Sequence, residues 1–291
     1  MATKSMKLSF VIPAYNEEEY IGECLEAITA QRQGLPYDVE VIVVNNNSTD
    51  RTEDVVRRYP GVRIVEEKTK GLVPAREAGF KAATGDLIAN VDSDTRIPRG
   101  WIRRVMEEFE HDPKLVALSG PFIYYDAPWS VRFFTRFFYY VSYVLNTLAP
   151  WFFPVLQGGN FVVRKSALEK IGGYRTDLNF YGEDTDVAKR MNKVGKVKFT
   201  FKLPTKSSGR RLAKEGGLTI GLRYTMNYFW IIFFNRPFTK KSDDIRLKNG
   251  SAVVYAPENR LKEWLIGTGI VLFLLALATI IVYLIKHVVG W

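Results

Sequence analysis

The chain has 291 residues, with 41 lysines and arginines against 31 aspartates and glutamates, which gives a formal net charge of +10. This length can bury one large α/β domain with an appendage. A single cysteine excludes an internal disulfide bond, and two histidines exclude a zinc cluster. The positive charge favours phosphates or lipid headgroups as partners. The sequence has no basic stripe with interleaved aromatic residues, so a nucleic-acid partner is not indicated.

Short apolar segments alternate with amphipathic ones over the first 120 residues. Apolar segments of this length predict strands and amphipathic ones predict helices. The predicted strands are 8–12, 39–44, 62–65, 87–91 and 116–118, and the predicted helices are 18–31, 52–59, 72–83 and 101–110. This order predicts an α/β fold with a mostly parallel sheet and helices on both faces. A ligand is then expected at the carboxyl ends of the strands.

Polar residues follow the first, second and fourth predicted strands, in the sequences PAYNEE, NNNSTD and DSD. The last of these places Asp92 and Asp94 at the end of a buried strand, where two carboxylates lose water and repel each other. In an extended chain the two aspartates point to one side and Ser93 points to the other. A positive partner is therefore expected at this pair.

The sequence YGEDTDVAKRM, residues 181–191, predicts a helix with acidic residues in its first turn. Asp186 and Arg190 are four residues apart and are expected to pair on one face. Asp184 shares its face with apolar residues and is expected to point toward the edge of the sheet. Burial without a cationic partner raises the pKa of a carboxyl group, as a general base requires. Helix capping alone is the alternative.

Three segments are rich in aromatic and aliphatic residues. Residues 264–285 form about 22 residues without a charge, roughly 33 Å as a helix, and predict a transmembrane helix. Residues 128–154 carry only Arg132 and Arg136 as charges and predict an interfacial amphipathic helix, with a buried core helix as the alternative. The same two interpretations apply to residues 220–238. No secretory signal opens the chain, so we expect a single-pass membrane protein whose N-terminal domain is cytoplasmic.

Five motifs occur in order along the chain: VIPAYNEE, VVNNNSTDRT, KGLVPAREAGFKAATGDLIANVDSDT, GGNFVVRKSALEKIGGY and GEDTDVAKRM. In order, spacing and strand context they resemble glycosyltransferase family 2, which has the GT-A (Rossmann-like) fold, over about residues 7–212. The resemblance and the apolar C-terminal segment together predict three regions. These are a GT-A domain at 1–212 with the aromatic segment 128–156, an amphipathic or linker region at 213–260, and a C-terminal transmembrane helix at 261–291.

The resemblance also supplies the missing positive charge, because the D-x-D pair of that family holds a divalent cation on the diphosphate of a nucleotide sugar. Carboxylate oxygens suit Mg²⁺ or Mn²⁺. By resemblance, Asp94 ligates the metal directly, and Asp92 contacts the ribose or reaches the metal through water. Further nucleotide-sugar-binding residues implied by the resemblance are Pro13, Tyr15, Glu17, Asn46, Arg76 and Ser93.

Three of these positions carry more detailed expectations. Pro13 is expected to end its strand. Asn46 stands where many relatives place an aspartate that reads the base, and an amide discriminates bases less well. Arg76 matches a family arginine near the diphosphate, and Lys70 is a second candidate or a surface charge.

The acceptor side is also implied by the resemblance. It makes Asp184 the base that deprotonates the acceptor hydroxyl, with Glu183 in support. Gly158 and Gly159 would let the backbone approach the acceptor, with a simple glycine turn as the alternative. The sequence SSGRRL has neither the metal-binding histidine nor the Q-x-x-R-W motif of some relatives. Processive polymer synthesis is therefore disfavoured, and phosphate contact is left to Arg210 or Arg211.

Together these features predict an inverting, metal-dependent glycosyltransferase that moves one sugar from a UDP- or GDP-sugar to a membrane lipid or lipid-linked acceptor. One alternative is a polyprenyl-phosphate glycosyltransferase, whose phosphate acceptor needs no strong base. The other is an inactive membrane scaffold that binds nucleotide sugars. The oligomeric state is left open.

Overall fold

A computed structural model describes residues 6–239 except residues 33 and 179. Its main sheet has seven strands in the order β3-β2-β1-β4-β7-β5-β8, and a second sheet pairs β6 with β9. The strands are β1 (Leu8–Ala14), β2 (Val39–Asn45), β3 (Val62–Glu66), β4 (Leu87–Val91), β5 (Leu115–Ser119), β6 (Phe122–Tyr124), β7 (Asn160–Arg164), β8 (Lys196–Phe199) and β9 (Thr205–Ser207). The helices are α1 (Ile21–Arg32), α2 (Thr52–Val56), α3 (Leu72–Ala82), α4 (Trp101–His111), α5 (Trp129–Leu148), α6 (Lys165–Lys170), α7 (Glu183–Met191), α8 (Arg210–Glu215) and α9 (Gly217–Phe234).

The predicted mostly parallel sheet is confirmed. Strands β1 to β4 pair in parallel, and so do β5 and β8, whereas β7 runs antiparallel between β4 and β5. Every residue of β4 and β5 is buried, which is why these strands read as continuous apolar runs in the sequence. The pattern of the first 120 residues could not reveal that a later segment, β7, separates β4 from β5.

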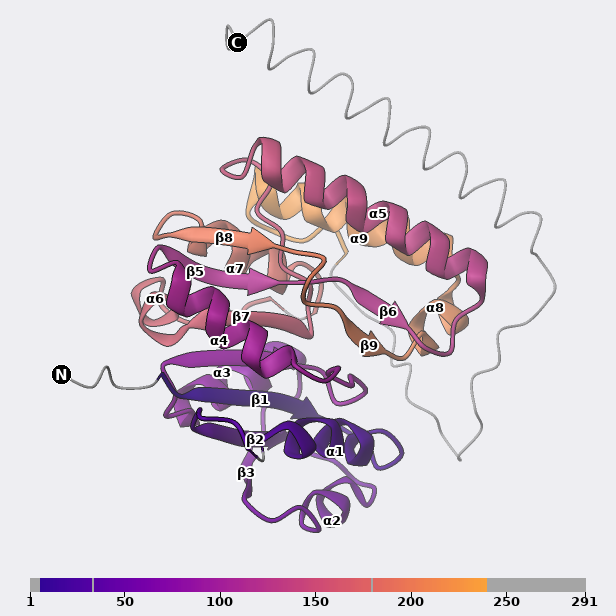
Figure 1. The fold of residues 1–291 in the computed structure, drawn as a ribbon. Helices are drawn as coiled ribbons and strands as arrows, with labels where there is room; N and C mark the ends of the chain where they lie inside the picture. The colour runs from indigo at the N-terminus through magenta and orange to yellow at the C-terminus, as the bar shows by residue number, and fades with distance from the viewer. Residues whose placement is uncertain (1–5, 33, 179, 240–291) are drawn as a thin grey trace, which may run out of the picture.

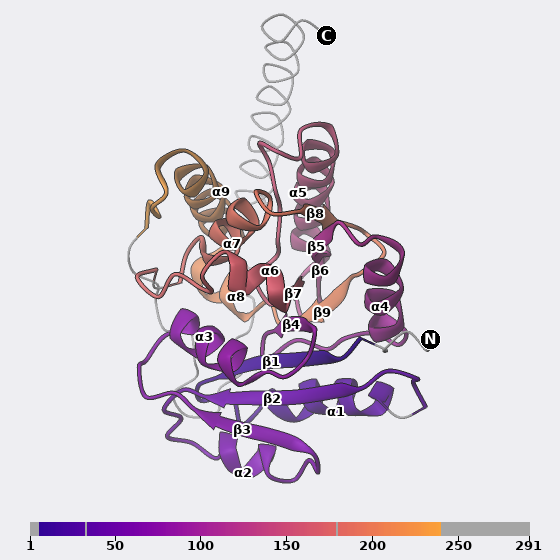
Figure 2. The ribbon, with the colours of Figure 1, turned by 90° about the vertical axis from the view of Figure 1, so that its left-hand side faces the viewer.

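Helices cover both faces of the main sheet, as predicted (Figures 1 and 2). Leu25 of α1 and Phe109 of α4 belong to the buried cluster on one face. Phe80 of α3, Leu168 of α6 and Met191 of α7 belong to the cluster on the other face. The two clusters fix the sheet and leave the carboxyl ends of β1, β2 and β4 for the loops that follow these strands.

The expectation that Pro13 ends its strand is wrong by one residue. Strand β1 runs to Ala14, and Pro13 pairs in register with Val44 of β2. On the other side of β1, pairing with β4 stops at Val11. A proline is tolerated there because one side of the strand already lacks a partner.

Helices α5 and α9 lie at the end of the molecule beyond β8 (Figures 1 and 2). Helix α5 packs on the sheet through Tyr139, whose ring stacks on Phe199 of β8 at 5.9 Å between centroids. Helix α9 packs through Ile231, which is fully buried in the cluster that includes α7. Residue 212, the predicted end of the GT-A domain, lies within α8.

Within residues 6–239, no described helix is long and apolar enough to cross a membrane. The transmembrane helix predicted at 264–285 and residues 240–260 of the predicted linker region lie outside the described residues.

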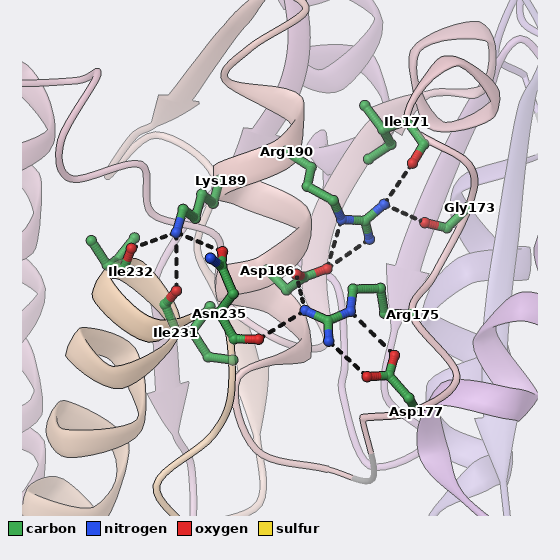
Figure 3. A network of polar contacts seen from close by, with 10 residues as sticks. All are labelled: Ile171, Gly173, Arg175, Asp177, Asp186, Lys189, Arg190, Ile231, Ile232 and Asn235. Carbon is green, nitrogen blue, oxygen red and sulfur yellow. Dashed lines mark hydrogen bonds and ion pairs between the residues drawn. The ribbon is translucent and has the colours of Figure 1, made fainter.

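Charged side chains anchor α7, as Figure 3 shows. Asp186 pairs with Arg190 at 2.7 Å, which confirms the predicted pair, and also with Arg175 at 3.3 Å. Lys189 donates to the carbonyl oxygen of Ile231 at 3.2 Å and to Asn235 Oδ1 at 2.8 Å, both at the C-terminal end of α9. Helix α7, whose first turn carries the candidate base, is therefore held against two neighbouring segments.

Candidate active site

A cavity of about 730 Å³ opens at the carboxyl ends of β1, β2 and β4, where the alternating pattern predicts a ligand. Residues from strand ends, from α3 and α7, and from the β7 approach line it together. Of the site residues predicted from the sequence, all but Gly159 line this cavity: Pro13, Tyr15, Glu17, Asn46, Arg76, Asp92, Ser93, Asp94, Gly158, Glu183 and Asp184. The fold thus brings the two predicted halves of the site into one space.

Arg76 joins the two halves. Its side chain is 1% exposed, its Nη2 lies 3.0 Å from Asp92 Oδ1, and its Nη1 contacts Glu183. Burial disfavours the charged guanidinium, but the two carboxylates outweigh it and raise the pKa of Arg76 above its ordinary value. The sequence places this arginine near a diphosphate. The structure places it at the cavity with its charge shared between two carboxylates.

Glu183 keeps one oxygen for other contacts. Its Oε2 is buried and accepts no hydrogen bond from any residue in the described part of the chain. A buried carboxylate oxygen without a donor is costly, so a hydroxyl group of a bound ligand would be favoured there.

Asp184 begins α7 and lies beside the turn that precedes β7. Its Oδ2 accepts the Gly158 N–H at 2.9 Å, and its Oδ1 accepts the Thr185 N–H at 2.7 Å. Burial raises the pKa of Asp184, while these two backbone hydrogen bonds oppose the rise. An oriented carboxylate with a raised pKa, facing a cavity, has the properties of a general base. Its role stays a prediction.

The two glycines before β7 make room for carboxylates. A Cβ atom at Gly158 would lie 3.2 Å from Asp184 Oδ2, and one at Gly159 would lie 2.1 Å from Asp92 Oδ2. Gly159 also has a φ of +80°, which favours glycine. The sequence links these glycines to the acceptor, whereas the closest approach that requires glycine is to Asp92.

Asp94 is more buried than Asp92, and it pairs with the same arginine, Arg210, as Glu17 does. Arg210 Nε is 3.2 Å from Asp94 Oδ2, and its Nη2 is 2.7 Å from Glu17 Oε1. The pKa of Asp94 is raised to about 7, because burial and the neighbouring Glu17 and Asp92 carboxylates outweigh the opposing effect of Arg210. The sequence motif SSGRRL marked Arg210 as a phosphate contact. Its pairing with Asp94 was not predictable because the two residues are far apart in the chain.

The aspartate pair suits a divalent cation. Asp92 and Asp94 line one cavity with hard carboxylate oxygens. The raised pKa of Asp94 reflects its burial first and the nearby Glu17 and Asp92 carboxylates second. In the part of the chain that the structure describes, no group of three or more His, Cys, Asp or Glu residues could hold a metal alone. A cation at this pair would therefore take further ligands from a bound phosphate, as Mg²⁺ commonly does.

Asn46 lines the cavity, but its amide is engaged by backbone. Its Nδ2 donates to the carbonyl oxygens of Glu67 at 2.7 Å and Thr69 at 2.8 Å, and its Oδ1 accepts the Gly71 N–H at 2.8 Å. Both amide hydrogens are thus used to hold the loop before α3. In this arrangement the Asn46 side chain holds the loop that lines the cavity, and neither of its amide hydrogens is available to a nucleobase.

Lys70 belongs to the same loop. Its Nζ donates to the Tyr15 hydroxyl at 2.7 Å and lies 4.0 Å from the centre of the Tyr15 ring. Lys70 and Tyr15 both line the cavity, so this contact places a cation in its wall. Lys70 is exposed, as a surface charge would be, and it also lines the cavity, as a contact to a diphosphate would.

The far end of the cavity is apolar. Residues from α5, α9 and the segment between α5 and β7 line it, among them Phe138, Val141, Leu145, Phe153, Tyr228 and Phe229. The aromatic segments 128–154 and 220–238 thus supply the wall of the site as well as surface. The sequence pattern did not predict this wall, because it depends on how α5 and α9 pack after the chain folds.

The outer face of α5 is apolar as well, and two cations lie on it. Trp129, Phe133 and Tyr140 are 68%, 58% and 58% exposed. Arg132 and Arg136 are exposed too. The helix is amphipathic, as predicted. Its other side, which includes Tyr139, is buried, so the alternative of a core helix holds for that side.

Comparison with known proteins identifies similar sequences. The model of glycosyl transferase family 2 matches residues 9–172. A probable glycosyltransferase of Bacillus subtilis, YdaM, is 32% identical over 204 residues, which are 65% of this chain and 47% of that protein. A dolichol-phosphate mannosyltransferase of Pyrococcus furiosus is 37% identical over 110 residues, which are 36% of this chain and 31% of that protein. The chain spans less than half the length of these relatives.

Among solved structures, a mannosyltransferase of Pyrobaculum calidifontis in complex with GDP-Man and Mn²⁺ superposes with a TM-score of 0.64. The two chains are 24% identical, and the match covers 80% of this chain and 64% of that one. At this identity the likeness establishes a shared fold, in agreement with the strand order described above.

Proposed function

This chain belongs to glycosyl transferase family 2, and we propose that it is an inverting, metal-dependent enzyme. It would transfer one sugar from a UDP- or GDP-sugar to a hydroxyl group of a membrane lipid or lipid-linked acceptor. One observation carries the proposal: a single cavity joins Asp94 and Asp184 at a charged end to an apolar end between α5 and α9.

The charged end suits the donor. Asp92 and Asp94 would hold Mg²⁺ or Mn²⁺, and Arg76 fixes the orientation of Asp92 through its 3.0 Å contact. A divalent cation at this position neutralises the charge that develops on the leaving nucleoside diphosphate. Lys70, at the donor side, adds a further cation within reach of a phosphate.

Asp184 would accept the proton of the acceptor hydroxyl, and Glu183 Oε2 would orient the acceptor. Asp184 lies beside Gly158 and Asp92 lies beside Gly159. The base and the group that holds the leaving diphosphate would therefore be neighbours on two sides of one turn. A single displacement between them would invert the configuration of the sugar. A positioned base of this kind contributes about 10²- to 10⁴-fold in rate.

The apolar end supports a lipid acceptor. Its lining would cover an acyl or prenyl chain, while the outer face of α5 presents exposed aromatic rings and Arg132 and Arg136 to a headgroup layer. We extend the proposal to a membrane-bound enzyme with its catalytic domain on the cytoplasmic side. The apolar sequence at 264–285 supports the anchor.

Two neighbouring residues of α5 provide the test. Leu145 lines the cavity and Val144 does not. With the full chain in detergent, a lipid extract and a soluble sugar offered together, we expect the labelled sugar in the lipid fraction. Leu145→Asn should raise KM for the lipid several-fold with an unchanged donor KM, and Val144→Asn should change neither. Transfer to the soluble sugar alone would overturn the lipid acceptor.

A second candidate is a polyprenyl-phosphate glycosyltransferase. Arg211 lines the cavity and lies 4.5 Å from the Phe180 ring, where it could meet an acceptor phosphate. The relatives include a dolichol-phosphate mannosyltransferase. An ionised phosphate needs no base, so Asp184→Asn would then keep most of the turnover. A loss of several hundredfold would favour a hydroxyl acceptor instead.

A further inference from the structure

Arg210 lies where a cation neutralises the donor end of the cavity. It is the first residue of α8, and its side chain is 9% exposed. Its guanidinium pairs with Glu17 at 2.7 Å and with Asp94 at 3.2 Å, and its central carbon lies 4.5 Å from the centre of the Tyr20 ring. This guanidinium is thus enclosed by groups from the loop that joins β1 to α1 and from the turn after β4.

The backbone that carries Arg210 is fixed. Asp126 accepts the Ser208 hydroxyl at 2.6 Å and the Gly209 N–H at 2.5 Å. The turn between β9 and α8 is therefore tied to the chain that follows β6. A change in the position of the guanidinium requires only rotation of the Arg210 side chain.

We propose that Arg210 couples the binding of the divalent cation to the binding of the nucleoside diphosphate. Its guanidinium holds Asp94 before the donor binds and turns to the diphosphate when metal and nucleotide enter together. This inference rests on the proposed function, because it assumes that both ligands bind at the donor end.

The coupling follows from competition for Asp94. Both of its oxygens have partners, since Ser207 Oγ lies 3.4 Å from Oδ1 and Arg210 Nε lies 3.2 Å from Oδ2. A cation that arrives alone would be repelled by the buried guanidinium or would displace it from one of its two carboxylates. A diphosphate offers the displaced guanidinium new oxygens in a geometry that arginine binds well. Metal and nucleotide therefore favour each other, and by the same factor in both directions.

Lys214 provides a matched control. It lies on α8 and carries the same charge, but it is exposed and does not line the cavity. Replacing Arg210 or Lys214 by methionine removes one positive charge from α8. Only Arg210→Met removes the contact with Asp94.

The test is a titration of the full chain with Mn²⁺, followed by the electron paramagnetic resonance signal of free Mn²⁺, with and without UDP or GDP. We expect Arg210→Met to bind Mn²⁺ alone about tenfold more tightly than the wild type, and the enhancement by nucleotide to fall by a similar factor. Lys214→Met should behave like the wild type. Circular dichroism of each variant checks that it is folded.

Equal Mn²⁺ affinities for the wild type and Arg210→Met would overturn the inference. An equal rise in Mn²⁺ affinity in Arg210→Met and in the control variant would overturn it too. If Arg210→Met does not fold, Arg210→Gln replaces it in the same comparison. In the wild type alone, tight Mn²⁺ binding that nucleotide does not improve would also contradict the coupling. Failure of both nucleotides to bind in the presence of Mn²⁺ would count against the proposed donor. The Arg210 account would then be judged on Mn²⁺ alone.

Discussion

Arg76 of α3 and Glu183 of α7 form a buried ion pair across the cavity floor, 107 residues apart in the chain. The same guanidinium also contacts Asp92, so one cation links the donor carboxylate to the helix that carries Asp184. The relative position of the two halves of the site is thus set by a contact outside the reacting groups.

Removing this cation should destabilise the protein. Arg76→Met leaves the buried Glu183 carboxylate and the partly exposed Asp92 carboxylate without their partner. The loss of one member of a buried pair costs about 3–5 kcal/mol. The free energy of unfolding in urea measures it. Lys81→Met is the control on the same helix, because Lys81 pairs with Glu77 at 3.1 Å and its side chain is 71% exposed. An exposed pair is worth about 1 kcal/mol or less, so similar losses in both variants would contradict the role of Arg76.

Gly159→Ala should disturb Asp92. The new Cβ would lie 2.1 Å from Asp92 Oδ2, at a φ of +80°. Gly172 has a φ of +81° and nothing within 4 Å of such a Cβ, so Gly172→Ala carries the backbone strain without the collision. We expect Mn²⁺ and nucleotide binding to weaken in Gly159→Ala and to stay unchanged in Gly172→Ala, as isothermal titration calorimetry would measure.

The pH dependence of turnover should report Asp184. A base must be ionised, so kcat/KM falls when the pH drops below its pKa. Burial raises the pKa of Asp184 above 3.8, so this fall should lie at a higher pH than for an exposed aspartate. A pH profile from 4.5 to 8.5 measures it. An unchanged acidic limb in the residual activity of Asp184→Asn would assign the limb to another group.

Asp184→Asn should also change how the stability of the fold depends on pH. A carboxyl group whose pKa is raised on folding contributes stability below its unfolded pKa and loses it as the pH rises through the folded pKa. Asparagine has no such loss. The Tm difference between variant and wild type should therefore grow in favour of the variant between pH 4.5 and 7.5. A difference that shrinks over this range would contradict the buried, raised pKa of Asp184.

Local patterns explain why much of this site was predictable from the sequence. The strand before Asp92 is buried and mostly apolar, and the Asp186 and Arg190 pair follows from helix geometry. Contacts between distant segments left no such local pattern. The pairing of Arg210 with Asp94 and the position of β7 between β4 and β5 both depend on tertiary packing.

Asn46 shows a second kind of difference. Its place after β2 was predicted, but its amide holds the loop at Glu67 and Thr69. A side chain that suits a ligand also suits backbone groups, and the sequence does not distinguish the two. The apolar wall made by α5 and α9 was not predicted for a related reason. An aromatic segment can face lipid, core or substrate, and the sequence does not distinguish these three environments.

The most direct test of the account is nucleotide release from a panel of UDP-, GDP- and dTDP-sugars. The full chain would be incubated with Mn²⁺ and membrane lipids, and the sugar followed into product. We predict release of one nucleoside diphosphate with transfer of its sugar to lipid, lost on chelation and in Asp94→Ala. Turnover that is equal in Asp94→Ala, or no turnover of any donor with intact protein, would contradict the proposed chemistry at this cavity.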